Sequence, residues 1–166
     1  MSYKVTVERN TLRFAAAHFA TFGDECEPLH GHNYDVIVEV EGELTGDGWV
    51  VDFGVLKSIV RELCQELDHK FLLQRNSKVL EIDEGKSNWK VRFRERPGGR
   101  PSGRGWVFPK SDVLPLPIEN STVEQLARWF AERLRERLAE RGATNLTSIS
   151  VGIEEMPGQA GWWTEA

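Results

Sequence analysis

The sequence predicts an α+β protein with a mainly antiparallel sheet and helices packed on one face of that sheet. The first observation is the segment from Tyr34 to Gly42, where three valines share one face and Asp35, Glu39 and Glu41 lie on the other, as expected for a strand with one buried face. The second is apolar residues at helical spacing in two segments, beginning near Asp52 and near Thr122. The third is the order strand, strand, helix, insertion, helix, strand, which is typical of this class.

Composition indicates one globular domain and excludes several classes of function. The chain has 166 residues, 40% hydrophobic and 28% charged, with a net charge of -5; such a chain can bury a core, and its acidic balance disfavours general binding of nucleic acid or anionic membranes. No apolar run approaches the ~20 residues that span a bilayer, and no signal-peptide pattern opens the chain. We therefore expect a cytoplasmic location, and the two cysteines predict no disulfide framework.

The N-terminal half predicts two strands and one helix. Residues Lys4 to Arg9 alternate polar and apolar side chains and form the first expected strand. Residues Ala20 to Leu29 contain glycine and proline and predict a loop before the strand from Tyr34 to Gly42. Asp52 is the expected N-cap of the first helix, which should end between Leu67 and Lys70.

The C-terminal half predicts a second helix and a closing strand. The helix begins at Thr122, with Asn120, Ser121 or Thr122 as its cap, and Gly142 terminates it. Alternation at Ile149, Val151 and Ile153 predicts the last strand; no repeat or second domain is evident. An open sheet has edges that need pairing, and oligomerisation is one way to pair them.

Residues 74–117 form an insertion between the two helices. Val79–Ile82 and Trp89–Phe93 predict a short hairpin, Pro97–Gly105 predicts a flexible basic loop, and Trp106–Phe108 predicts another strand. The insertion can cover a site, contact phosphates or only decorate the surface, and its arginines are Arg92, Arg94, Arg96, Arg100 and Arg104.

Three of the four histidines indicate a metal site. His30 and His32 are two apart, so in an extended segment both imidazoles point the same way, and Gly31 leaves room between them. His18 can supply a third nitrogen. Three ligands with one open position are typical of catalytic zinc. The alternative is scattered polar or core histidines, but three within fifteen residues favour metal.

A second group of residues can move protons. Cys26 precedes the paired histidines, and a cysteine beside a metal or an imidazolium has a lowered pKa. Asp68 is next to His69 and can orient that imidazole. The alternatives are a buried thiol for Cys26 and a helix C-terminal polar pair for Asp68 and His69.

Two adjacent glutamates end the last expected strand. Glu155 continues the face of Val151 and Ile153, and an inward carboxylate needs a partner. A heterocycle with adjacent N–H donors, such as the edge of a pterin, would suit it. The alternatives are an exposed strand end, or recognition through Glu154 instead.

Together these residues resemble the family of 6-pyruvoyl-tetrahydropterin and 6-carboxytetrahydropterin synthases. The resemblance is carried, in order along most of the chain, by Phe14–His18, Cys26–Tyr34, Gly48–Phe53, Leu56–Lys57, Leu67–His69, Asn120–Ala127 and Val151–Glu155. It implies the tunnelling fold (T-fold), in which antiparallel sheets with two helices per subunit assemble into an oligomeric barrel. It also implies a homohexamer of two stacked trimers, with active sites at subunit interfaces.

The resemblance further implies roles for individual residues. Zinc would be bound by His18, His30 and His32, and protons moved by Cys26, Asp68 and His69. The pterin would be anchored by Glu155, with Glu154 as the fallback, and contacted by Thr122 at the opening of the second helix.

The implied reaction converts 7,8-dihydroneopterin triphosphate to 6-carboxy-5,6,7,8-tetrahydropterin, with loss of triphosphate and acetaldehyde, in the queuosine branch. Formation of 6-pyruvoyl-tetrahydropterin is one alternative. Another is side-chain cleavage to 6-hydroxymethyl-dihydropterin, because some subgroups use a glutamate near the position of Glu25 or Glu27. A zinc-stabilised pterin-binding protein without activity is a third, but such a binder would not need Cys26, Asp68 and His69.

Overall fold

The computed structural model describes residues 1–166 and confirms the α+β class. Its main sheet has seven strands: β1 (Tyr3–Val7), β2 (Arg13–His18), β5 (His30–Gly42), β6 (Lys70–Gln74), β10 (Val113–Leu116), β11 (Leu146–Met156) and β12 (Gln159–Glu165). The order is β10-β6-β2-β5-β11-β12, with β1 paired to β5. The sheet is mixed, because β6 runs parallel to both β2 and β10 while the other pairs are antiparallel.

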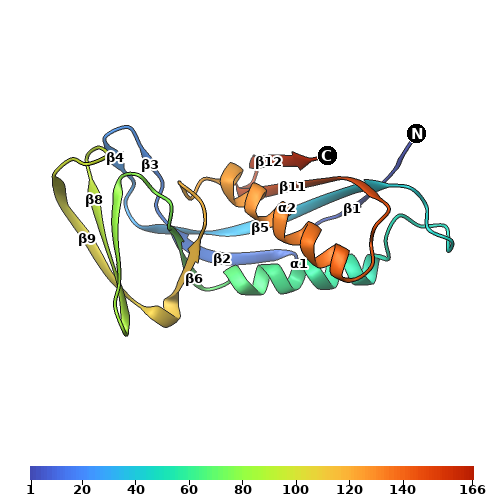
Figure 1. The fold of residues 1–166 in the computed structure, drawn as a ribbon, viewed down its shortest axis with the longest axis horizontal. Coiled ribbons are helices and arrows are strands. Elements are labelled where there is room, and N and C mark those ends of the chain that lie inside the picture. Colours follow the sequence, from blue (N-terminus) through green and yellow to red (C-terminus); the bar gives the residue numbers. More distant parts are fainter.

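Helices α1 (Phe53–Leu67) and α2 (Val123–Glu140) cover one face of this sheet (Figure 1). Asp52 caps α1 as predicted, since its side chain accepts a hydrogen bond of 2.9 Å from the backbone N–H of Val55. Thr122 is the N-cap residue of α2 but makes no side-chain capping bond, and Gly142 follows the helix with a φ of 84°. The apolar stripes of both helices and the inward valines of β5 form one core of 29 buried residues. Neither helix is both long and apolar enough to span a membrane.

The insertion folds as a separate antiparallel sheet of β7 (Leu80–Glu84), β8 (Asn88–Arg94) and β9 (Pro101–Pro109). It lies at one end of the molecule, beside the small hairpin of β3 (Thr21–Phe22) and β4 (Glu25–Cys26) (Figure 1). A 3-10 turn at Lys110–Asp112 leads back to β10. One face of the insertion sheet contributes to a second core of nine buried residues: Phe19, Cys26, Phe71, Leu73, Leu80, Trp89, Val91, Phe93 and Val113.

Several boundaries differ from those predicted. Strand β5 begins at His30 rather than Tyr34, and β9 begins at Pro101, so half of the expected flexible loop Pro97–Gly105 is strand. Strand β6 was not predicted because it has no polar–apolar alternation. Its neighbouring residues Phe71 and Leu72 are both buried, the first in the small core and the second in the main core. Strands β10 and β12 were missed because both are edge strands: β10 has only four residues, and Gly161 is the one buried residue of β12.

The N-cap of α1 generates a stability prediction. Replacing Asp52 with alanine should lower the free energy of unfolding by about 1 kcal/mol, because the first-turn N–H of Val55 loses its acceptor. The matched control is Asp47→Ala, which removes an exposed loop carboxylate. Urea unfolding at one fixed protein concentration measures both, and equal midpoints for the two variants would contradict the capping role.

Candidate metal centre and substrate site

Pairing between β2 and β5 brings the three histidines together. The register places His18 opposite His30, and His32 is two residues further along β5 on the same face. One ligand atom from each imidazole lies within 4.8 Å of the others. Gly31 between them faces the opposite side of the sheet, where a Cβ would lie 3.0 Å from the carbonyl oxygen of Ala16. The predicted cluster therefore forms within one chain.

Two backbone carbonyls orient the rings for metal binding. His18 Nδ1 lies 2.9 Å from the carbonyl oxygen of Ser121, and His30 Nδ1 lies 2.7 Å from that of Pro28. Since a carbonyl only accepts, both Nδ1 atoms carry the proton and both Nε2 lone pairs are free. Such contacts are typical of ligand histidines.

The buried nitrogen of His18 is otherwise without a partner. Its Nε2 is buried and makes no hydrogen bond, a costly arrangement unless something binds there. Burial lowers the pKa of His18 to about 4, with the Ser121 hydrogen bond opposing that shift. The imidazole is therefore neutral near pH 7, the form that coordinates a cation. The donor set fits a divalent metal ion with an open position.

The structure places Glu155 beside this cluster. Residue pairing between β11 and β12 is irregular between Glu154 and Met156, and Glu155 occupies the bulge. Its carboxylate lies 3.8 Å from Nε2 of His32, and its side chain is 29% exposed. Glu154 instead accepts a hydrogen bond of 3.2 Å from the N–H of Gly158 in the following turn. The glutamate that faces the histidines is thus the one that strand alternation selected.

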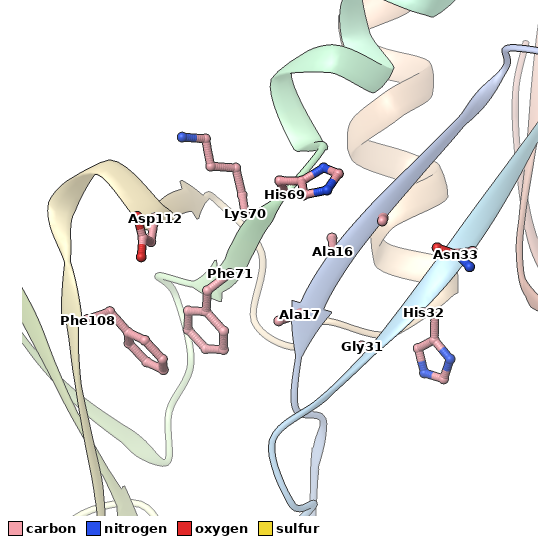
Figure 2. Close-up of a pocket in the computed structure, with 11 residues that line it drawn as sticks. Ala16, Ala17, Gly31, His32, Asn33, His69, Lys70, Phe71, Phe108 and Asp112 are labelled. Atoms are coloured by element: carbon pink, nitrogen blue, oxygen red, sulfur yellow. The ribbon is translucent and has the colours of Figure 1, made fainter.

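Asp68 and His69 form a hydrogen-bonded pair, but away from the three histidines of the same chain. Asp68 Oδ2 lies 2.7 Å from His69 Nδ1, and Asp68 Oδ1 accepts a bond of 2.7 Å from the N–H of Ala15. The hydrogen bond from the Ala15 backbone makes the largest contribution to lowering the pKa of Asp68, and the bond to His69 lowers it further. The imidazole is largely exposed, at 82%. Figure 2 shows His69 at the start of β6 and His32 on β5, with β2 between them.

An open pocket of about 500 Å³ lies over β2 between these two positions (Figure 2). Its volume is within the range of small-molecule sites. Its lining combines the small side chains of β2 with aromatic and charged groups: Ala15, Ala16, Ala17, Gly31, His32, Asn33, His69, Lys70, Phe71, Phe108 and Asp112. His69 thus lines an open pocket that has room for a small molecule or for side chains of another subunit.

Cys26 and Glu27 point in different directions. Cys26 is 8% exposed within the small core, and burial raises the pKa of its thiol. The carboxylate of Glu27 lies 3.9 Å from Nε2 of His30 and accepts a bond of 2.8 Å from the N–H of Ala20. The structure thus places Glu27, rather than the sulfur, next to the histidines of one chain.

Two neighbouring residues, Ser121 and Tyr34, were not singled out as site residues from the sequence. Ser121 orients His18 through its carbonyl, and its hydroxyl donates a bond of 2.8 Å to the carbonyl of Phe19. Tyr34 is fully buried on the histidine face of β5, its hydroxyl has no hydrogen-bond partner, and burial raises its pKa. Alternation from His32 could have identified Tyr34, whereas no sequence signal links Ser121 with a residue 103 positions away.

Comparisons with known proteins agree with this geometry. The family model described as 6-pyruvoyl tetrahydropterin synthase matches residues 6–165. A protein of Methanocaldococcus jannaschii, assigned as a 6-carboxy-5,6,7,8-tetrahydropterin synthase, is 37% identical over 151 residues, which cover 89% of this chain and 86% of that protein. A dihydroneopterin monophosphate aldolase of Pyrococcus furiosus is 30% identical over 125 residues, covering 75% of this chain and 71% of the aldolase.

Solved structures show the same fold. The 6-pyruvoyltetrahydropterin synthase of Plasmodium vivax superposes with a TM-score of 0.88 at 32% identity, covering 99% of this chain and 98% of that one. That structure is of a variant in which a catalytic glutamate is replaced by alanine.

The histidine cluster generates a metal-binding prediction. His32→Ala should lower bound metal well below the roughly one ion per subunit expected for the unaltered chain, because it removes one of three ligands. His69→Ala is the matched control, as it removes the fourth histidine, which lies outside the cluster. Plasma emission on dialysed protein measures both. Undiminished metal in His32→Ala would rule out this ligand set.

Proposed function

The chain belongs to the 6-pyruvoyl tetrahydropterin synthase family, and on that premise we propose that it converts 7,8-dihydroneopterin triphosphate and water to 6-carboxy-5,6,7,8-tetrahydropterin, triphosphate and acetaldehyde. The observation that carries this proposal is the convergence of three histidine ligands and the carboxylate of Glu155 on one face of β5 and β11. The similarity to the Methanocaldococcus protein supports this product, and that reaction would serve the queuosine branch.

Zinc is the metal that we propose for His18, His30 and His32. Bound there, it would act as a Lewis acid that polarises the side-chain hydroxyls of the substrate and lowers their pKa. The protein fixes two of the rings through the carbonyls of Ser121 and Pro28, so little reorganisation is needed when the ligand arrives. The surrounding core excludes water from His18, which is 3% exposed.

Glu155 is proposed to hold the pterin ring. A carboxylate can accept two parallel hydrogen bonds from adjacent N–H donors of the heterocycle, and such charge-assisted bonds are stronger than neutral ones. Its position 3.8 Å from His32 would place the bound substrate's side chain next to the histidine cluster. Thr122, half-buried at the start of α2, is the proposed second contact.

Proton transfer is proposed for Cys26, Asp68 and His69. Asp68 would hold the His69 ring in one tautomer through their 2.7 Å contact. Because β2 separates His69 from His32 in one chain, we propose that a second copy supplies its Asp68–His69 pair to the site. The free outer edges of β10 and β12 offer backbone groups for such assembly, consistent with a proposed hexamer of two trimers.

A second candidate is side-chain cleavage to 6-hydroxymethyl-dihydropterin. The observation that favours it is the placement of Glu27, whose carboxylate is 3.9 Å from His30 while the Cys26 thiol is buried with a raised pKa. The Pyrococcus relative named as an aldolase also favours it. Glu27 would then move the proton that Cys26 moves in the first proposal.

Product analysis separates the two candidates. With dihydroneopterin triphosphate as substrate, mass spectrometry should show 6-carboxy-5,6,7,8-tetrahydropterin. Cys26→Ala should keep its metal yet lose roughly a hundred-fold in turnover, as expected for a lost acid–base group. Asp24→Asn, at an exposed turn position beside this strand, is the control. A 6-hydroxymethyl product that disappears in Glu27→Gln and persists in Cys26→Ala would establish the second candidate instead.

Pterin recognition is tested at the two adjacent glutamates. Glu155→Gln should weaken binding of 7,8-dihydroneopterin by about 1.5–3 kcal/mol, the range for a lost charge-assisted hydrogen bond. Glu154→Gln should change it little, because that carboxylate bonds to the turn at Gly158. Fluorescence titration of metal-loaded protein measures both dissociation constants. A larger loss in Glu154→Gln would move the anchor by one residue.

A further inference from the structure

The sheet of the insertion packs against the loop that leads into the paired histidines. Phe19 and Cys26 from this loop share the small core with Trp89, Val91 and Phe93 of β8. Phe19 and Cys26 are therefore covered by side chains of β8, which have no role in the proposed chemistry. The insertion is therefore joined to the site and does not merely decorate the surface (Figure 1).

Arg104 on β9 makes the polar contact between the two. Its guanidinium donates one hydrogen bond to the carbonyl oxygen of Cys26 and another, of 3.3 Å, to that of Glu27. The same guanidinium lies 5.3 Å from the ring centroid of Trp106, which stacks on Phe19 at 4.4 Å. We refer to the two hydrogen bonds from Arg104 to Cys26 and Glu27 as the arginine clamp.

The chemistry of the clamp requires a guanidinium. Two neighbouring carbonyls are bridged by separate N–H groups of one rigid, planar guanidinium, which also lies within cation–π distance of the Trp106 indole. A lysine ammonium lacks the two N–H groups in fixed planar geometry that bridge these carbonyls. No Asp or Glu carboxylate forms a salt bridge with Arg104, so its polar partners are the backbone carbonyls of Cys26 and Glu27.

The clamp holds the two residues whose side chains are the proposed alternatives for proton transfer. The Glu27 N–H donates to the Ala20 carbonyl at 3.0 Å and the Glu27 carboxylate accepts from the Ala20 N–H at 2.8 Å, which closes the base of the loop. Arg104 fixes the same peptide from the other side. A displacement of about 1 Å at a reacting group can cost a hundred-fold in rate.

We propose that Arg104 is a positioning residue that holds the peptide between Cys26 and Glu27 in the orientation needed for proton transfer. This inference rests on the proposed function, because it assumes that one of those two side chains moves the proton. In this proposal, the insertion sheet supports the segment that carries Cys26 and Glu27. Contact with the phosphates of the substrate is the competing role for this arginine.

The test compares Arg104→Gln and Arg104→Lys with the control Arg100→Gln. The control removes the same charge from the same insertion, at an exposed arginine that makes no hydrogen bond or ion pair. All variants are prepared as the metal-loaded assembly. Melting temperature and metal content are recorded first, so that misfolded protein is recognised before any rate is compared.

The first measurement needs no substrate. Hydrogen–deuterium exchange in peptides that span residues 19–29 should become about tenfold faster in Arg104→Gln, since two hydrogen bonds that resist local opening are lost. Exchange should remain unchanged in Arg100→Gln and elsewhere in the chain. Equal exchange in Arg104→Gln and the unaltered protein would overturn the clamp, whatever reaction the enzyme performs.

The second measurement is steady-state turnover of dihydroneopterin triphosphate. Arg104→Gln should lower kcat and kcat/KM together by roughly ten- to a hundred-fold, as expected when a group is misplaced in the transition state. Arg104→Lys should recover little, whereas added methylguanidinium should restore part of the rate to Arg104→Gln.

A rise in KM with unchanged kcat would overturn the positioning role in favour of phosphate contact. Faster exchange with unchanged turnover would also overturn it. If the unaltered protein turns over no dihydropterin at all, the proposed function fails, and the positioning role that rests on it fails too. A normal wild-type rate with no effect in Arg104→Gln overturns only the positioning role.

Discussion

The antiparallel pairing of β2 with β5 is the constraint on which the candidate site depends. It places His18 directly opposite His30, and side-chain alternation then brings His32 to the same face. A slip of one residue would turn the histidines of one strand to the other face and dissolve the cluster. The register is held by the fully buried Val36 and Val38 further along β5, so the geometry of the site is a consequence of core packing.

The histidine cluster could be predicted from the sequence because it depends on short-range rules. Side chains two residues apart in a strand share a face, as His30 and His32 do, and His18 lies on the neighbouring strand β2. The helices were predictable for the same reason, since α1 begins at an aspartate cap and carries a regular apolar stripe. By contrast, β6 has buried residues on both faces and shows no period, and β12 is an edge strand.

Long-range contacts were the part of the site that the sequence could not reveal. Ser121 meets His18, and Arg104 meets Cys26, across 103 and 78 residues respectively, and neither contact has a local pattern. A buried thiol was one of the alternatives for Cys26, but the sequence could not show that the insertion sheet covers it. Side-chain alternation did select Glu155 over Glu154, and the carboxylate of Glu155 is the one that lies beside His32.

The carbonyl contacts that hold two of the histidine rings have a consequence for how this cluster would take up a metal ion. The three nitrogens are assembled by strand pairing within the folded chain, so the ion has no folding step to drive, in contrast to a zinc finger. Three imidazoles also accept several divalent ions, with affinities that rise from manganese to copper. Three imidazoles alone would therefore discriminate weakly among divalent ions, and the ion bound at such a site would depend on which ions are available to it.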